Sequence, residues 1–128
     1  MTLKAYEGGN PAVESDYFLV ANRAVPALVS LFIGNRSPDS PDVNPLYCQP
    51  EELKGLSPQL IFTGGGEFAR YDSEEWAKVC QKAGLDYKLT IEWAQLHIYA
   101  VGSRFTDPAV RRKTDDMIIE WIKLYVAQ

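Results

Sequence analysis

Two side chains of this 128-residue sequence have the types and the placement for acid–base catalysis. Glu67 follows the apolar run 59–63 across three glycines, and His97 follows the alternating run 86–93. A carboxylate that accepts a hydrogen bond from one imidazole nitrogen fixes the tautomer of the ring, and the other nitrogen can then take a proton from a nucleophile. The two residues are therefore a candidate base and its orienting acid. An alternative stays open, in which Glu67 is a capping or solvated residue and His97 bonds only to backbone.

The two runs that precede these residues are typical of neighbouring strands. The apolar run 59–63 stops at a glycine triplet, as expected of a buried parallel strand that ends in a turn. The run 86–93 alternates apolar and polar residues up to Trp93, which predicts a half-buried strand at an outer position of the sheet. In open α/β sheets, functional groups lie beyond the carboxyl ends of the strands. We therefore expect Glu67 and His97 to emerge from adjacent strand ends and to meet.

Two helices are predicted to flank these strands. One spans 73–83, with Asp72 at the capping position before it and Gly84 at its end. The other begins at Pro108, since proline favours the first helical turn, and continues to the C-terminus. Spacings of three and four predict an inward stripe in the second helix made of Val110, Thr114, Met117, Ile118, Trp121, Ile122 and Tyr125. Its charged residues, Arg111, Arg112, Asp115, Asp116 and Lys123, are predicted to face water.

The domain organisation is predicted to be a single incomplete α/β domain over residues 1–128. Residues 1–35 form a helical segment that Pro26 kinks or divides. Residues 36–58 form an irregular connection, because five of the eight prolines lie there, and residues 59–128 hold the strands and their helices. Two strands with their helices cannot close an α/β sheet, so the first strand would expose an unpaired apolar edge if the chain stood alone.

Composition and charge narrow the function classes. The chain is 46% hydrophobic and 23% charged, which is typical of a globular protein with a core. A net charge of −4 and a pI near 5.0 give no reason to expect nucleic acid or an anionic membrane as partner. No apolar stretch is long enough to span a bilayer, and the first residues lack a secretory signal, so an intracellular location is the default expectation and localisation is otherwise open.

Metal and nucleotide sites are not expected. Two cysteines and one histidine do not give a zinc-ligand pattern, so we predict no metal and no cofactor. The glycine triplet at 64–66 lacks the lysine and serine of a phosphate-binding loop, which leaves nucleotide binding as a weak alternative.

The order and spacing of several segments resemble a known family. These segments are 40–46, 60–67, 82–84, His97 and the helix that contains Trp121. Together they resemble the C-terminal half of α/β-hydrolases of the hormone-sensitive-lipase-like carboxylesterase branch, and especially its fungal esterase and sterol-deacetylase-like members. The resemblance implies a partial α/β-hydrolase fold, with the last strands of a mostly parallel sheet, flanking helices and a preceding helical segment linked to the cap.

The resemblance also implies roles for individual residues. Glu67 matches the triad acid, with Asp72 as the alternative acid, and His97 matches the triad histidine. Glutamate departs from the aspartate of many relatives but is an accepted triad acid. Gln95 before the histidine departs from the usual glycine-containing loop. The residues implied to line the substrate pocket are Phe18, Phe68, Ile98 and Tyr99, with Leu28 and Phe32 as further candidates.

The third member of a serine-hydrolase triad is not found in the sequence. A nucleophile elbow G-x-S-x-G and an oxyanion loop of the H-G-G-G type are both absent. We therefore expect a small ester substrate for the complete parent enzyme and no turnover by this chain alone. The alternative is a non-catalytic interaction module, which binds a protein partner or a second copy through its exposed sheet edge.

Overall fold

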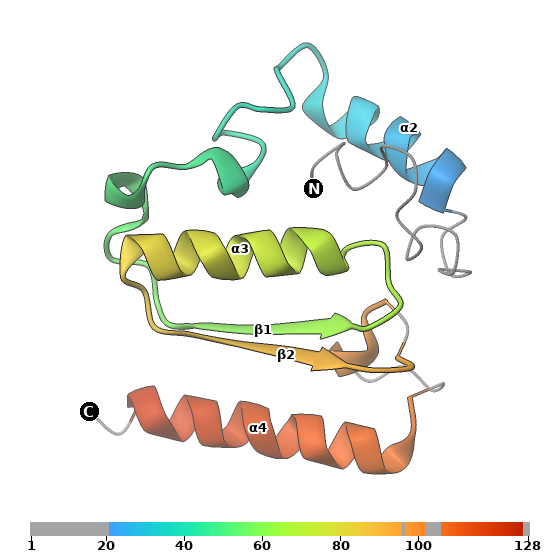
Figure 1. Ribbon diagram of the computed structural model, residues 1–128, viewed down its shortest axis with the longest axis vertical. Helices are drawn as coiled ribbons and strands as arrows, with labels where there is room; N and C mark the ends of the chain where they lie inside the picture. The colour runs from blue at the N-terminus through green and yellow to red at the C-terminus, as the bar shows by residue number, and fades with distance from the viewer. Residues whose placement is uncertain (1–20, 96, 102–105, 127–128) are drawn as a thin grey trace.

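The computed structural model describes residues 21–95, 97–101 and 106–126 (Figure 1). Strand, helix, strand and helix alternate in the second half, so the predicted partial α/β fold is confirmed. The division at residues 35 and 58 stays a prediction. The elements are α2 (Ala21–Ile33), η2 (Pro45–Tyr47), η3 (Pro50–Leu53), β1 (Gln59–Gly64), α3 (Arg70–Ala83), β2 (Tyr87–Glu92), η4 (Tyr99–Val101) and α4 (Pro108–Val126).

The two strands pair in parallel between two helices. Their register runs from Gln59 opposite Tyr87 to Gly64 opposite Glu92. Figure 1 shows α3 on one side of the strands and α4 on the other, so the molecule has three layers here. Because the strands are parallel and in register, their carboxyl ends lie next to each other at one end of the sheet.

Helix α3 begins three residues earlier than predicted. Its N-cap is Ala69, and the first helical bond runs from the Ser73 amide to the Ala69 carbonyl over 3.1 Å. The prediction that Asp72 caps the helix is therefore wrong, because the tight turn after β1 already leads into the helix at Arg70. The predicted end is confirmed, since Gly84 adopts the left-handed conformation with φ 68°.

Helix α4 starts as predicted and is only partly covered. Asp107 caps it by accepting a hydrogen bond from the Ala109 amide at 2.7 Å. Thr114 is buried, and the charged residues predicted to face water are exposed. Ile122, predicted to face inward, is 52% exposed, because the half-buried Trp121 and Tyr125 take the covered side of the last helical turns. Lys113 bridges to Glu92 at 2.6 Å and ties α4 to the end of β2.

The end of β2 differs from the predicted alternation. The strand stops at Glu92, and Trp93 lies in the turn that follows. Trp93 is 66% exposed, so its predicted inward position is wrong. The physical reason is that Ala94 has a left-handed φ of 60°, and this reversal ends the period of two.

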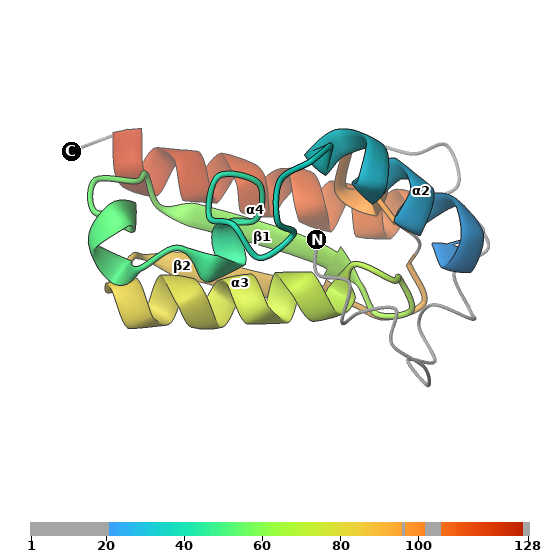
Figure 2. The same cartoon turned by 90° about the horizontal axis from the view of Figure 1, so that it is seen from above.

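The segment before the sheet lies over α3. Helix α2 continues through Pro26 as one element, so the predicted division there is wrong; a proline removes one amide donor, and the remaining helical bonds persist. The connection includes η2 and η3, which both contact α3. Buried Asn44 organises it by accepting from the Leu46 amide at 3.2 Å and donating to the Pro38 carbonyl at 3.4 Å. Figure 2 shows the connection crossing above the strands.

One side of β1 has no strand beside it in the described ranges. The strand pairs with β2 alone, and Leu60, Ile61 and Phe62 are only half-buried. The predicted unpaired edge is therefore present in this structure. Among the helices within residues 21–126 that the structure describes, none is long and apolar enough to cross a membrane.

Candidate functional site

The structure brings together the acid and the histidine singled out in the sequence. The ladder extends one residue past β1, where the Gly65 amide donates to the Glu92 carbonyl at 2.9 Å. Glu67 follows in the turn, and its Oε2 lies 2.6 Å from Nδ1 of His97. The expected meeting of these two side chains at adjacent strand ends is thus observed.

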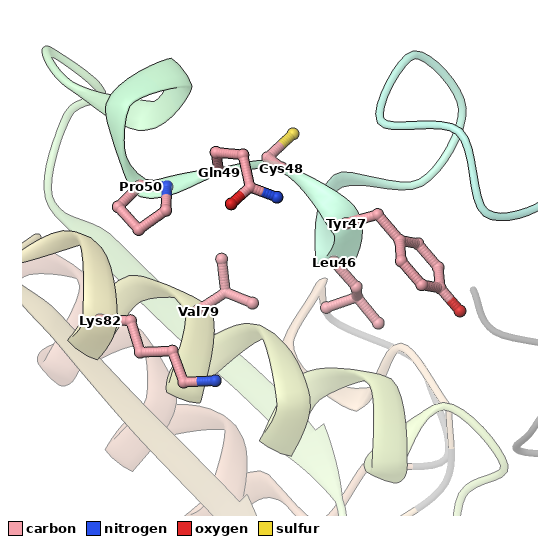
Figure 3. Close-up of a pocket in the computed structure, with 7 residues that line it drawn as sticks. All are labelled: Leu46, Tyr47, Cys48, Gln49, Pro50, Val79 and Lys82. Atoms are coloured by element: carbon pink, nitrogen blue, oxygen red, sulfur yellow. The ribbon is translucent and has the colours of Figure 1, made fainter.

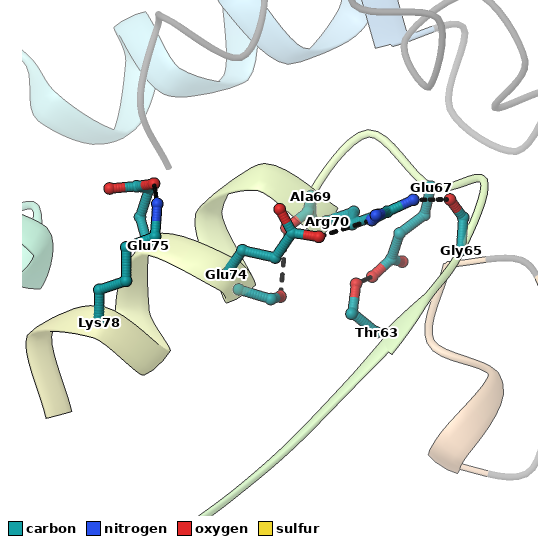
Figure 4. Close-up of polar contacts among 9 residues, drawn as sticks. Thr63, Gly65, Glu67, Ala69, Arg70, Glu74, Glu75 and Lys78 are labelled. Carbon is teal, nitrogen blue, oxygen red and sulfur yellow. Dashed lines mark hydrogen bonds and ion pairs between the residues drawn. The ribbon is translucent and has the colours of Figure 1, made fainter. Parts of the chain in front are cut away.

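The Glu67 carboxylate is buried and bonded at both oxygens. The residue is 4% exposed, so each oxygen needs a partner within the protein. Oε1 accepts a hydrogen bond from the Thr63 hydroxyl, and Oε2 faces His97. Figure 4 shows Thr63 on β1 pointing toward Glu67. Because an ionised carboxylate only accepts, the proton between Glu67 and His97 belongs to Nδ1, and Nε2 is then the nitrogen that can take a proton.

Phe68 fixes the position of the imidazole ring. Its side chain is 1% exposed, and its ring lies 4.9 Å from the His97 ring, centroid to centroid, at an interplanar angle of 41°. The residue after the acid therefore packs against the histidine. Carboxylate and aromatic contacts together define both the direction and the plane of His97.

The loop that carries His97 has a strained backbone. Ala94 and Ile98 both adopt left-handed conformations, with φ values of 60° and 59°. Such a conformation costs roughly 1–2 kcal/mol per non-glycine residue, and β-branched Ile98 is a pronounced outlier. Ile98 is 47% exposed, so its side chain gains little from burial. Contacts elsewhere must therefore hold the loop in place.

Tyr99 anchors this loop beneath the sheet. It is 2% exposed, its ring lies edge-on to Phe62 at 6.4 Å, and its carbonyl accepts a bond from the Thr106 hydroxyl at 3.2 Å. Burial raises the pKa of Tyr99 to about 12, and the nearby carboxylates of Glu92 and Glu67 act in the same direction.

The other predicted site residues lie elsewhere. Asp72 is in the first turn of α3, where it lines a hollow of about 280 Å³ with Asn44, Ile61 and Trp76. The acid that contacts His97 is Glu67. Phe18 lies outside the described residues, and Leu28 and Phe32 are exposed on α2.

Arg70 was not identified from the sequence, yet it joins the two strand ends. Its guanidinium stacks 4.7 Å above the Trp93 ring. It also donates to the Gly65 carbonyl at 3.2 Å and pairs with Glu74 at 2.8 Å, as Figure 4 shows. Gly65 allows this close approach, because a Cβ there would lie 2.6 Å from Cε3 of Trp93. A glycine triplet before a charged helix start is only a faint signal of such packing.

A second hollow lies between the Pro-rich connection and α3 (Figure 3). Its volume is about 280 Å³, and it is lined by Leu46, Tyr47, Cys48, Gln49, Pro50, Val79 and Lys82. Burial raises the pKa of the Cys48 thiol, with Glu52 and Asp42 adding to the effect, so this cysteine is a poor nucleophile. In the part of the chain that the structure describes, no three metal-ligating side chains gather in one place.

Known proteins are similar to this chain in sequence and in fold. Residues 3–101 match the family described as alpha/beta hydrolase fold. A homologue of hormone-sensitive lipase, EstE7, from a metagenome library is 24% identical with a TM-score of 0.74, over 88% of this chain and 37% of the other. A hormone-sensitive lipase from a metagenome library is 22% identical with a TM-score of 0.78, over 95% and 40%. The chain therefore spans less than half the length of these two solved proteins.

The search of curated proteins found no match to the sequence. With its family match over residues 3–101 and its parallel strands, the chain belongs to the alpha/beta hydrolase fold family.

Proposed function

We propose that this chain is the part of a serine carboxylic ester hydrolase that supplies the acid and the histidine of the catalytic triad. The observation that carries the proposal is the contact of 2.6 Å between Glu67 Oε2 and His97 Nδ1 at adjacent strand ends. Membership of the alpha/beta hydrolase fold family supports it, because that fold places its triad beyond the strand ends. The two similar solved proteins are called a hormone-sensitive lipase and its homologue, which favours an ester as substrate.

The proposed mechanism gives the two nitrogens of the His97 ring different roles, because Nδ1 keeps its proton and Nε2 carries every proton transfer. Glu67 holds Nδ1–H and stabilises the imidazolium, and Nε2 of His97 takes the proton from a serine hydroxyl as that oxygen attacks the ester carbonyl. The same proton then passes to the leaving alcohol. In the second half, Nε2 of His97 removes a proton from water as its oxygen attacks the acyl-serine. The bond from carbonyl carbon to serine oxygen then breaks, the proton passes from Nε2 to that oxygen, and the carboxylic acid leaves.

The nucleophile and the oxyanion donors would come from residues outside this chain. The sequence contains no G-x-S-x-G elbow and no H-G-G-G loop. A base without a nucleophile or oxyanion donors has little acyl transfer to perform. We therefore expect the chain by itself to be inactive toward esters.

We assign substrate contacts to the candidate residues whose side chains are exposed near His97. Ile98 is 47% exposed next to His97 and is the best placed of the described candidates to touch an acyl or alcohol group. Phe68 and Tyr99, at 1% and 2%, would shape the pocket from beneath, by holding His97 and its loop. Asp72 would have no direct part in the triad.

The first test is an assay of the purified chain with short-chain p-nitrophenyl esters. The expected result is no turnover above the uncatalysed rate. Turnover that an organophosphate abolishes would overturn the proposal that the nucleophile lies outside the chain.

The second test is a chimera that joins this chain to the amino-terminal part of the similar hormone-sensitive lipase from a metagenome library. Glu67→Gln should lower kcat on the order of 10⁴-fold, because the wrong tautomer is no longer excluded. His97→Ala should lower it at least as much. Glu120→Gln, an exposed change on α4, is the matched control. A folded, active chimera that tolerates Glu67→Gln would contradict the assigned roles.

A second candidate function is association through the open edge of β1. The observation that favours it is the half-buried apolar run Leu60, Ile61 and Phe62 on a strand with one paired side in the described residues. A second copy would pair edge to edge and cover this run. Light scattering after size exclusion should then give twice the chain mass, and a stable monomer at high concentration would exclude this candidate.

A further inference from the structure

Thr63 is the third polar side chain of the buried site. It is the fifth residue of β1, opposite Ile91 in the sheet, and only 1% of it is exposed. Its hydroxyl donates to Oε1 of Glu67, the carboxylate oxygen that does not face His97. The high β propensity of threonine is by itself enough to explain a threonine in a buried strand. Here, in addition, the hydroxyl bonds to Glu67, four residues later in the sequence.

The physical need for this contact comes from the carboxylate itself. The terminal torsion of a glutamate side chain has a broad energy minimum, so packing of the chain does not fix the plane of its oxygens. A donor on Oε1 removes that freedom. The same donor gives Oε1 a hydrogen-bond partner. Glu67 is only 4% exposed, so an oxygen without a partner would carry a large desolvation penalty.

The neighbouring groups do not replace Thr63. The phenyl ring of Phe68 packs against the imidazole at a tilt of 41°, and a phenyl ring has no hydrogen to donate to a carboxylate. Arg70 contacts Glu74, the Gly65 carbonyl and the Trp93 ring. The hydroxyl of Thr63 and the imidazole of His97 therefore hold the two carboxylate oxygens from different elements.

We propose that Thr63 is a positioning residue, whose hydroxyl sets the plane of the Glu67 carboxylate and thereby keeps His97 in the tautomer with the proton on Nδ1. Its consequence for catalysis rests on the proposed function, but the orientation of His97 is a property of this chain. Thr63 acts through Glu67 and would touch no substrate.

The test uses the one histidine of the sequence, whose ring nitrogens give two ¹⁵N resonances that need no assignment between residues. Their shifts report the tautomer of His97, and exchange of the Nδ1 proton with water reports its hydrogen bond. Thr63→Val removes the hydroxyl at nearly equal volume and should give a mixture of tautomers with exchange at least about tenfold faster, as expected for loss of one bond to a charged group.

Two variants control this result. Thr63→Ser keeps a hydroxyl and should retain the Nδ1–H tautomer. Ser73→Ala removes another side-chain hydroxyl, which donates to the Ala69 carbonyl on α3 at 3.2 Å, and should leave the His97 signals unchanged. A folded Thr63→Val chain with the native tautomer and exchange rate would overturn the proposal.

A measurement on the unaltered chain covers the case in which Thr63→Val does not fold. The Thr63 hydroxyl proton should be protected from water and give a cross-peak to its own methyl group. If it exchanges as fast as an exposed threonine hydroxyl, the proposal is wrong. Glu67→Gln distinguishes a failure of the proposed function from a failure of the role of Thr63. If Glu67→Gln leaves the His97 tautomer unchanged, the Glu67–His97 pair and the proposed function are wrong. If Glu67→Gln changes the tautomer and Thr63→Val does not, only the role of Thr63 is wrong.

Discussion

The two strand ends that form the candidate site are built in different ways. The turn after β1 is buried and regular, with Gly65, Glu67 and Phe68 all below the surface. The loop after β2 is open, since Trp93 and Ile98 are 66% and 47% exposed, and it has two residues in the left-handed region. The acid is thus placed by its own packing, and the histidine by contacts from other elements.

This difference predicts how each end responds to change. Damage at the β1 end should cost global stability, because its residues are part of the core. Damage at the β2 end should cost less, because that loop depends on a few anchors: Glu67 and Phe68 at His97, and Tyr99 beneath the sheet. The following predictions run from the largest expected effect to the smallest.

Phe68→Ala should break the β1 end. The side chain is 1% exposed, and its removal should lower the free energy of unfolding by about 3–5 kcal/mol. Ile98→Ala is the counterpart at the β2 end and should cost less than about 1 kcal/mol, because half of that side chain is already in water. Urea unfolding followed by circular dichroism measures both, and equal losses would remove the contrast between the two ends.

Tyr99 makes the β2 end sensitive to alkali. Its pKa is raised to about 12 from an ordinary value of 10.0, so the folded state holds the proton more tightly than the unfolded state. The resulting stability is complete below pH 10 and is lost as the pH rises from 10 to about 12, by about 3 kcal/mol. Urea midpoints at pH 9, 10 and 11 should fall more steeply for the unaltered chain than for Tyr99→Phe. Identical slopes would show that Tyr99 does not anchor the loop in its neutral form.

Gly65→Ala should disturb the contact between the two ends. The new Cβ would lie 2.6 Å from Cε3 and 3.1 Å from Cα of Trp93, so one strand end must shift, at a cost of about 1–3 kcal/mol. Introducing the same change into a Trp93→Ala chain should cost less, because the nearest atoms are gone. If the losses of unfolding free energy in this double-mutant cycle are additive, the ends of β1 and β2 are not in energetically coupled contact.

Ala94→Gly should release strain in the loop after β2. With φ at 60°, glycine avoids a steric penalty, and the net gain after unfolded-state entropy should be about 0.5 kcal/mol. The reverse change at a helix end, Gly84→Ala at φ 68°, should cost about 1 kcal/mol. Thermal midpoints that move in the same direction for both variants would contradict this account of the loop.

Much of the fold follows from local patterns. The apolar run before the glycines and the alternation after Asp86 predicted both strands. Gly84 and Pro108 marked the end of one flanking helix and the start of the other. These signals work because they arise from short-range sterics and from one buried face. The errors lie where neighbouring residues determine the outcome. Helix α3 starts at Arg70 because of the turn before it, and Ile122 is exposed because Trp121 and Tyr125 take the covered side of α4.

The candidate site was predictable only in part. Strand order and residue type were enough to single out Glu67 and His97, since carboxyl ends of parallel strands share one edge. The contacts of Thr63 and Arg70 depend on rotamers and on the distance between turns, for which a single sequence has no pattern. The aromatic contact of Phe68 with the imidazole is of the same kind.

By itself, the sequence determined which segments become strands and helices, and which two ionisable side chains follow the strand ends. These outcomes depend on interactions between residues close together in the chain. Only the tertiary structure decided that Glu67 rather than Asp72 contacts His97, that Tyr99 is buried while Ile98 is exposed, and that Thr63 holds the second carboxylate oxygen. Those outcomes depend on the relative positions of β1, β2 and the loop beyond them, and hydrogen bonds and packing discriminate among such arrangements over distances of an ångström or less.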